Sequence, residues 1–149
     1  MLEALKKEDL DEIVAIDTIC FPAPWNKEQY VYELEENDYA FIYVLKEEGH
    51  IIGFIDYWIT FDIAQLAKIA VLPQYRGRHY AHRMMDQMIK DVEEKHCETL
   101  SLEVRVSNIA AQRLYEAYDF INVNTRKGYY HDNGEDAYVL VKALKGGCL

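Results

Sequence analysis

The chain has 149 residues, of which half are apolar and 28% are charged, a composition typical of one globular domain rather than a disordered chain. No apolar run is long enough to span a bilayer, so no membrane partner is expected. A formal net charge of −10 at pH 7 argues against a nucleic-acid partner, because phosphate contacts need a basic face. The acidic surface suits a cationic peptide substrate, although many cytoplasmic proteins are acidic without one.

The cysteines and the N-terminal segment indicate an intracellular compartment. Cys20, Cys97 and Cys148 have spacings that suit neither a metal site nor a disulfide framework, so reduced thiols are expected. Met1 to Glu12 carries charges and lacks the apolar region of a signal peptide. We therefore expect a cytoplasmic protein.

The first half of the chain predicts two helices between strands. Apolar residues recur at helical spacing after Asp9, and Phe21-Pro-Ala-Pro-Trp25 interrupts that pattern. Asn26 followed by Gln29 is typical of a helix cap. The expected elements are a strand at 2–5, a helix from Asp9, a helix from Asn26, and paired strands at 40–45 and 51–59 joined by a turn containing Gly49.

The second half predicts strands that alternate with helices. The expected elements are a strand at 64–71, a turn at 74–77, a helix with an apolar stripe from Ala81 to Val92, a strand at 100–104, a helix from Asn108 to about Tyr118, and strands at 121–125 and 137–141 joined by Asp132-Asn-Gly134. Together they predict a single α/β (α+β) domain over residues 1–149. Its mixed sheet of about six to seven strands has helices on both faces and a ligand crevice at the carboxyl ends of the central strands.

The most informative stretch runs from Ile69 to Ala81, where a strand, a tight turn with Gly77 and a helix start follow one another. A helix N-terminus presents unpaired N–H groups and partial positive charge, which can hold a pyrophosphate. Arg76 and Arg78 add positive charge in a chain that is otherwise acidic. Taken alone, the stretch also fits an ordinary turn with exposed arginines.

The pattern Gln74-x-x-Gly77-x-His79 resembles the coenzyme-A-binding motif of the GNAT superfamily, Gln/Arg-x-x-Gly-x-Gly/Ala. His79 departs from its last position, and histidine fits there without strain if φ is negative and at modest cost if φ is positive. Leu102-Glu-Val-Arg105, Ser107-Asn108 and the run from Arg113 to Phe120 resemble the second half of the family pattern. The resemblance covers nearly the whole chain.

This resemblance implies a GNAT fold in which two parallel strands splay apart and hold acetyl-CoA, whose pantetheine pairs with the earlier strand like an added strand. The residues that it implies for cofactor binding are Ile69, Ala70, Val71, Gln74, Arg76, Gly77, Arg78, His79, Tyr80, Ala81, His82 and Asn108. Helix capping alone would also explain Asn108.

Within the superfamily, three segments are similar to enzymes of the RimI type, which acetylate the N-terminal alanine of a small-subunit ribosomal protein. They are Phe21-Pro-Ala-Pro-Trp25, the Leu-Glu-Val-Arg run and Lys127-Gly-Tyr-Tyr130. His131 stands where these enzymes usually have proline. Trp25, Tyr129 and Tyr130 are candidates for a groove that holds the peptide, because amphipathic aromatic side chains give contact area and a polar tip, although all three also fit core positions.

By the same resemblance, Glu103 accepts a proton from the attacking amine and Tyr115 donates one to the leaving thiolate. A phenol with an ordinary pKa near 10 is protonated at neutral pH and can supply that proton. The alternatives are a surface glutamate and a tyrosine that packs against the sheet.

Three functions remain open at this stage. They are an N-terminal protein acetyltransferase, a GNAT enzyme for a small amine or a lysine side chain, and a coenzyme-A-binding module that regulates a partner without catalysis. Because Glu103 and Tyr115 are both present, catalysis is favoured over binding alone. His79 and His82 have no carboxylate or cysteine that completes a metal site, so no metal is expected.

Overall fold

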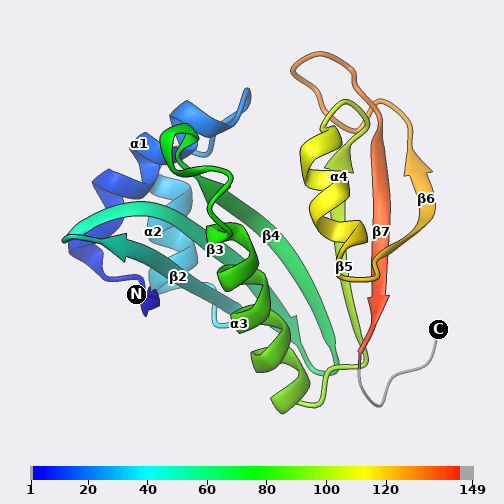
Figure 1. Ribbon diagram of the computed structural model, residues 1–149, viewed down its shortest axis with the longest axis horizontal. Coiled ribbons are helices and arrows are strands. Elements are labelled where there is room, and N and C mark those ends of the chain that lie inside the picture. The colour runs from blue at the N-terminus through cyan, green and yellow to red at the C-terminus, as the bar shows by residue number, and fades with distance from the viewer. Residues whose placement is uncertain (1, 145–149) are drawn as a thin grey trace.

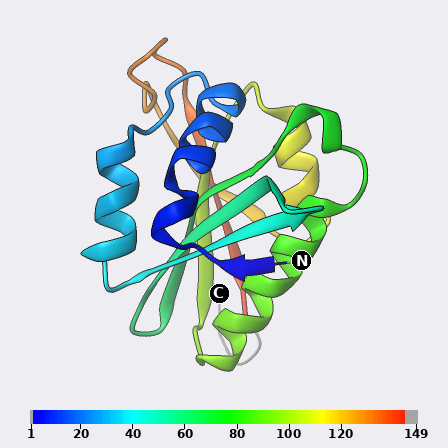
Figure 2. The ribbon, with the colours of Figure 1, turned by 90° about the vertical axis from the view of Figure 1, so that its left-hand side faces the viewer.

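The computed structural model describes residues 2–144, which form one seven-stranded sheet with helices on both faces (Figures 1 and 2). The strands are β1 (Leu2–Ala4), β2 (Ala40–Glu47), β3 (His50–Thr60), β4 (Ile63–Val71), β5 (Thr99–Arg105), β6 (Ile121–Arg126) and β7 (Ala137–Ala143). The α-helices are α1 (Leu10–Cys20), α2 (Lys27–Glu35), α3 (Tyr80–Glu94) and α4 (Ile109–Glu116), and the 3-10 turns are η1 (Lys7–Asp9) and η2 (Pro73–Tyr75). The predicted fold class is confirmed.

The state of the cysteines and the character of the helices relate to two expectations from the sequence. Cys20 and Cys97 are free thiols, whereas Cys148 lies outside the described residues. No helix within residues 2–144 is both long enough and apolar enough to cross a membrane.

The order of the strands is β1-β2-β3-β4-β5-β7-β6, and every neighbouring pair is antiparallel except β4 and β5. This parallel ladder is short, because only Ile63, Ala64 and Gln65 of β4 pair with β5. The remainder of β4 pairs with β3 alone, while β5 continues along β7. Figure 1 shows the consequence, since β4 and β5 meet at one end and diverge toward the other.

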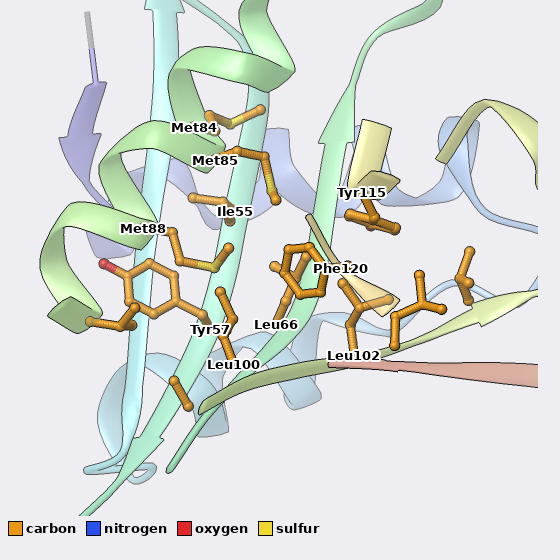
Figure 3. Packing of buried hydrophobic residues seen from close by; sticks show 14 of the residues in the cluster. Ile55, Tyr57, Leu66, Met84, Met85, Met88, Leu100, Leu102, Tyr115 and Phe120 are labelled. Carbon is orange, nitrogen blue, oxygen red and sulfur yellow. The ribbon is translucent and has the colours of Figure 1, made fainter. Parts of the chain in front are cut away.

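The two faces of the sheet carry separate hydrophobic clusters. On one face, α3 and α4 pack on the sheet, and the core there includes Met84, Met85, Met88 and Tyr115 (Figure 3). On the other face, α1 and α2 cover the N-terminal half of the sheet through residues such as Ile13 and Tyr30. Figure 2 shows the two helix pairs on opposite sides. Burial of apolar area is the main driving force of folding, and the cluster under α3 and α4 spans both halves of the sheet, from Leu45 of β2 to Leu140 of β7.

Local signals in the sequence account for most helix boundaries. Asn26 and Gln29 form the predicted capping box at the start of α2, with both hydrogen bonds at 2.9 Å. The sequence predicts a helix that begins at Asp9, but Asp9 is the last residue of the 3-10 turn η1, and its carboxylate accepts the Lys6 N–H at 3.0 Å. Helix α1 therefore begins one residue later, at Leu10. The last predicted helix ends at Glu116 rather than near Tyr118.

One carboxyl group lies wholly inside the protein. Asp56 of β3 is fully buried, and neither of its oxygens has a hydrogen-bond partner within the described residues. Burial first, and the nearby Glu33 carboxylate second, raise the pKa of Asp56 to about 10. The Glu33 carboxylate also accepts hydrogen bonds from Trp58 Nε1 and Asn37 Nδ2, both at 2.6 Å. Asp56 is therefore a neutral carboxylic acid at pH 7.

This proton makes folding stability depend on pH. In the unfolded chain Asp56 loses its proton near pH 4, whereas the folded protein retains it up to about pH 10. Between these values the folded state binds one more proton, so stability falls as pH rises, by up to about 1.4 kcal/mol per pH unit. We predict that Asp56→Asn, which is neutral at every pH, gains stability over the wild type progressively from pH 5 to pH 9 in urea unfolding.

The matched control is Asp38→Asn, which alters an exposed aspartate outside the helices and strands. The difference between this control and the wild type should stay nearly constant over the same pH range. A constant difference for Asp56→Asn as well would show that Asp56 is ionised in the folded protein.

Candidate functional site

The candidate site lies where β4 and β5 part. Leu100, Leu102 and Val104 of β5 are buried in the cluster under α3 and α4. Because side chains alternate along a strand, Glu103 points to the opposite face, on which α1 and α2 lie. Glu103 is two residues beyond Ser101, the last residue of β5 paired with β4. Its half-buried side chain therefore stands beside the opening between the strands.

Two side chains approach the carboxylate of Glu103. Gln65, the last residue of β4 paired with β5, directs its Nε2 toward Glu103 Oε1 at 3.5 Å. Tyr129, from the loop between β6 and β7, has its pKa raised by burial first and then by the charge of Glu103. The carboxylate is thus placed between β4 and that loop.

Tyr115 belongs to the other face of the sheet. It lies on α4, is only 6% exposed and packs against the ring of Phe120, with centroids 5.7 Å apart (Figure 3). Within residues 2–144 its hydroxyl makes no hydrogen bond. Burial raises the pKa of Tyr115, so the phenol is protonated at neutral pH and has a proton to donate. Glu103 and Tyr115 therefore approach the parted strands from opposite sides.

The open edge of β4 leads into the predicted phosphate loop. Ile69, Ala70 and Val71 pair with β3 on one side only, which leaves the backbone groups on their other side facing the opening. Gln74 is exposed on the 3-10 turn that follows. Gly77 has a φ of +79°, and a side-chain carbon there would meet no atom within 4 Å. The backbone at Gly77 is thus accessible to a ligand.

The two arginines of this loop differ in their contacts. The guanidinium of Arg76 donates to the Val71 carbonyl at 2.9 Å and contacts the Cys20 thiol at 3.6 Å. That of Arg78 lies 5.6 Å from the centre of the Tyr75 ring. Both side chains are exposed, so positive charge gathers at this end of β4.

Helix α3 begins directly after the loop. As the first helical residues, Tyr80, Ala81 and His82 present backbone N–H groups that have no hydrogen-bond partner in residues 2–144. The His82 ring lies 5.3 Å from that of His79, and its carbonyl accepts the Tyr118 hydroxyl at 3.0 Å. This helix terminus can accept an anion.

His79 precedes the helix in the left-handed conformation, with φ +63° and ψ +18°. The alternative with negative φ that the sequence left open is therefore wrong. This conformation explains why a family pattern with glycine at the position is physically favoured, because glycine alone adopts it without cost.

Asn108 is exposed at the start of α4, and its Oδ1 accepts the Ala111 N–H at 3.1 Å. The capping role that the sequence left as an alternative is therefore present. The side-chain amide N–H groups of Asn108 make no hydrogen bond within the described residues and remain free for a ligand.

Aromatic side chains border the face on which Glu103 lies. Trp25 is half-buried at the end of the loop between α1 and α2 and contacts Tyr30, with ring centroids 5.3 Å apart. Tyr129 is 41% exposed and meets the edge of Tyr130 at 5.0 Å. The guanidinium of Arg105 lies 4.0 Å above the Tyr130 ring. These residues can form the walls of a groove for a peptide.

Arg105 is a site residue that the sequence analysis did not assign. Besides Tyr130, it contacts Asp132 at 2.9 Å and Glu135 at 3.3 Å, and Glu135 also accepts the Ser107 N–H at 2.7 Å. The network joins the end of β5 to the loop that carries Tyr129 and Tyr130. Arg105 follows Glu103 by two residues and so shares its face, a spacing that could have indicated its place.

A buried ion pair between Lys68 and Asp17 is a second feature that was not predicted from the sequence. Their atoms lie 2.7 Å apart although 51 residues separate them in the sequence. The available signal was a lysine in a strand from Ala64 to Val71 whose other residues, except Gln65, are apolar, and an aspartate within the apolar face of α1.

The arrangement fits a thioester carried on a phosphorylated, extended cofactor. The open edge of β4 can pair with an extended chain, and the loop and helix terminus that follow can hold its phosphates. An acyl group at the opening would have a carboxylate on one side and a protonated phenol on the other. Acyl transfer to an amine needs such a proton acceptor and such a proton donor. Among residues 2–144 no group of three or more metal-ligating side chains occurs.

Comparison with known proteins agrees with this arrangement. Residues 10–120 match the model of the acetyltransferase (GNAT) family. A Bacillus subtilis (strain 168) protein, provisionally named a ribosomal protein bS18-alanine N-acetyltransferase, is 40% identical over 136 residues, covering 91% of this chain and 90% of its own. An N-alpha-acetyltransferase of Saccharolobus solfataricus is 33% identical over 156 residues, covering 96% of this chain and 92% of its own.

A solved structure is also similar. The crystal structure of the ribosomal-protein-S18-alanine N-acetyltransferase from Escherichia coli superposes with a TM-score of 0.88 at 28% identity, over 97% of this chain and 94% of that one. The chain belongs to the GNAT family of N-acetyltransferases, as its sequence predicted, and acetyl-CoA is the acyl donor.

The left-handed conformation of His79 leads to a stability prediction. Replacing a non-glycine residue at such a position with glycine removes steric strain of about 1 kcal/mol. We predict that His79→Gly raises the free energy of unfolding by up to about that amount in urea titrations. The control is His131→Gly, which alters an exposed histidine whose φ is not positive and should bring no gain. Equal loss of stability in both variants would contradict the strain.

Proposed function

We propose that this chain acetylates the N-terminal α-amine of a protein, and that its target is the N-terminal alanine of a small-subunit ribosomal protein. The observation that carries the proposal is the placement of Glu103 and Tyr115 on opposite faces of the opening between β4 and β5. The names of the Bacillus subtilis and Escherichia coli relatives support the choice of acceptor.

In the proposed reaction, Glu103 attracts the substrate ammonium and accepts its proton through a bridging water, which leaves the amine lone pair free to attack the thioester carbonyl. The N–C bond forms and the C–S bond breaks. Tyr115 then donates its proton to the departing thiolate, and the second proton that the nitrogen loses on becoming an amide passes to solvent, from which Tyr115 is reprotonated. Because Glu103 lies on the face that Trp25, Tyr129 and Tyr130 border, the amine in this proposal enters from that face, which also carries α1 and α2.

The cofactor occupies the other side in this proposal. Ile69, Ala70 and Val71 pair with its extended arm, and the free side-chain amide of Asn108 bonds that arm from α4. The loop residues Gln74, Arg76, Gly77, Arg78 and His79, with the N-terminal residues Tyr80, Ala81 and His82 of α3, surround its phosphates. The partial positive charge of the helix terminus and the charges of the two arginines together favour binding of these phosphates.

The ionisation of amines supports an α-amine as acceptor. An α-amino group has a pKa near 8 and a lysine side chain one near 10.4. At pH 7 roughly a tenth of α-amines are neutral, against less than about one lysine in a thousand. An enzyme with one carboxylate as its base therefore acts more readily on an N-terminus. We further propose that residues 1–149 act as one catalytic domain in the cytoplasm, where such N-termini are made.

A pair of peptides tests the proposed acceptor. We predict turnover of acetyl-CoA with an alanine-starting hexapeptide and none with the same peptide blocked at its N-terminus but carrying a free lysine. Release of coenzyme A is followed with a thiol reagent, and mass spectrometry locates the acetyl group. Acetylation of the lysine alone, or turnover only with small amines, would reject an N-terminal acceptor.

Two substitutions test the assigned roles together. We predict that Glu103→Gln and Tyr115→Phe each lower kcat at neutral pH by about a hundredfold or more, because each removes one proton transfer. Affinity for acetyl-CoA, measured by calorimetry, should change little in either variant. Wild-type kcat in one variant would remove that residue from the mechanism.

A further inference from the structure

A buried ion pair holds the loop between α1 and α2 against β4. Asp17, in the last turn of α1, is fully buried, and its two carboxylate oxygens accept hydrogen bonds from Lys68 Nζ at 2.8 and 2.7 Å. The same carboxylate accepts the Tyr30 hydroxyl and, at 3.2 Å, the backbone N–H of Trp25. Burying a charge is costly unless it is paired and hydrogen-bonded, and all these partners meet that need.

The ammonium of Lys68 also contacts both ends of this loop. It lies 4.5 Å from the centre of the Phe21 ring and 4.6 Å from that of Trp25. The Lys68 side chain is only 10% exposed, so these cation–π contacts operate largely away from water, where they are strongest. One side chain thus fixes the first and last aromatic residues of the loop.

The path of β4 explains why Lys68 reaches this loop. In the ladder with β3, Tyr57 pairs with Leu66 and Asp56 with Lys68, which leaves Ala67 as an extra residue. Without that bulge, Lys68 would point to the same face as Leu66, into the core under α3 and α4. The bulge turns Lys68 to the face of Glu103, three residues beyond the point where β4 leaves β5.

We propose that Lys68 is a positioning residue of the acceptor site. It holds the loop from Phe21 to Trp25 in the position from which this loop can bind the substrate beside Glu103. The inference rests on the proposed function, because it takes this face as the acceptor side. Asp17 neutralises Lys68, so the lysine acts through the two rings and the loop backbone, not by adding net charge near the substrate amine.

A similar group on the other face of the sheet provides a matched control. Asp91 accepts hydrogen bonds from Lys95 and, at 2.6 Å, from the Tyr57 hydroxyl, and Lys95 lies 4.9 Å from the centre of the Phe41 ring. It has the same chemistry as the Lys68 group but contacts no part of the loop from Phe21 to Trp25. Lys95→Met therefore reports the effect of losing such a lysine away from the acceptor side.

The test compares steady-state kinetics of Lys68→Met, Lys68→Arg and Lys95→Met with an alanine-starting hexapeptide and acetyl-CoA. We expect Lys68→Met to raise the KM for the peptide about tenfold and to change the KM for acetyl-CoA less than about twofold. Lys68→Arg should recover most of the peptide KM, and Lys95→Met should leave both values unchanged. An unchanged peptide KM in Lys68→Met, or an equal rise in both constants, would overturn the proposal.

Lys68→Met leaves Asp17 charged and buried without its ion-pair partner, which could unfold the protein. A second variant separates that effect from the loss of the positioning role. The double variant with Asp17→Asn and Lys68→Met removes both charges and keeps an oxygen for Tyr30 and Trp25. We expect it to fold and still to show the raised peptide KM. A wild-type peptide KM in this folded variant would also overturn the proposal.

Hydrogen exchange separates this inference from the proposed function. In the double variant, the amides of Phe21 and Trp25, which both donate to Asp17 in the wild type, should exchange at least about tenfold faster than in the wild type, whatever the substrate. Lys95→Met should leave them unchanged. Faster exchange without peptide turnover in the wild type would reject the proposed function alone, whereas unchanged exchange would reject the positioning role.

Discussion

The short parallel contact between β4 and β5 is the constraint on which the site depends. Three residues of β4 pair with β5, and the two strands then follow different partners, β3 and β7. A gap in a sheet normally exposes backbone groups that need hydrogen bonds, which is why an extended ligand can fill it. The hydrophobic cluster under α3 and α4 joins the two halves of the sheet, because it contains Leu66 of β4 and Leu102 of β5, while the cluster under α1 and α2 covers the N-terminal half.

The alternation of side chains along the strands then divides the chemistry between the two faces. On β5, the leucines and valine pack under α3 and α4, and the residues between them face α1 and α2. Glu103 is one of the residues that face α1 and α2. Tyr115 lies on α4, in the hydrophobic cluster on the other face, and reaches the gap from there. In the proposed mechanism, this carboxylate and this phenol act as base and acid on a substrate that lies between them. The bulge at Ala67 adds to this division, because it turns Lys68 away from the core under α3 and α4 and onto the face of Glu103.

Much of this structure could be predicted because its signals are local. The capping residues Asn26 and Asn108 lie within three residues of the backbone groups they bind, and the stripe of methionines on α3 follows helical spacing. Three other features could not be predicted in this way. The bulge at Ala67 depends on the register with β3, and the ion pair of Asp17 and Lys68 joins residues 51 positions apart. The positive φ of His79 was left open because histidine tolerates both conformations.

The most direct test of the account is a crystal structure with a bisubstrate inhibitor in which coenzyme A is joined through an acetyl bridge to the nitrogen of an alanine-starting peptide. We expect the coenzyme A part to lie along the open edge of β4 beside Tyr115 and the start of α3. The peptide should leave the gap on the opposite face, past Glu103 and between Trp25 and Tyr129. A peptide that leaves on the side of α3 and α4, with Glu103 remote from the bridged nitrogen, would contradict the division of the site between the two faces.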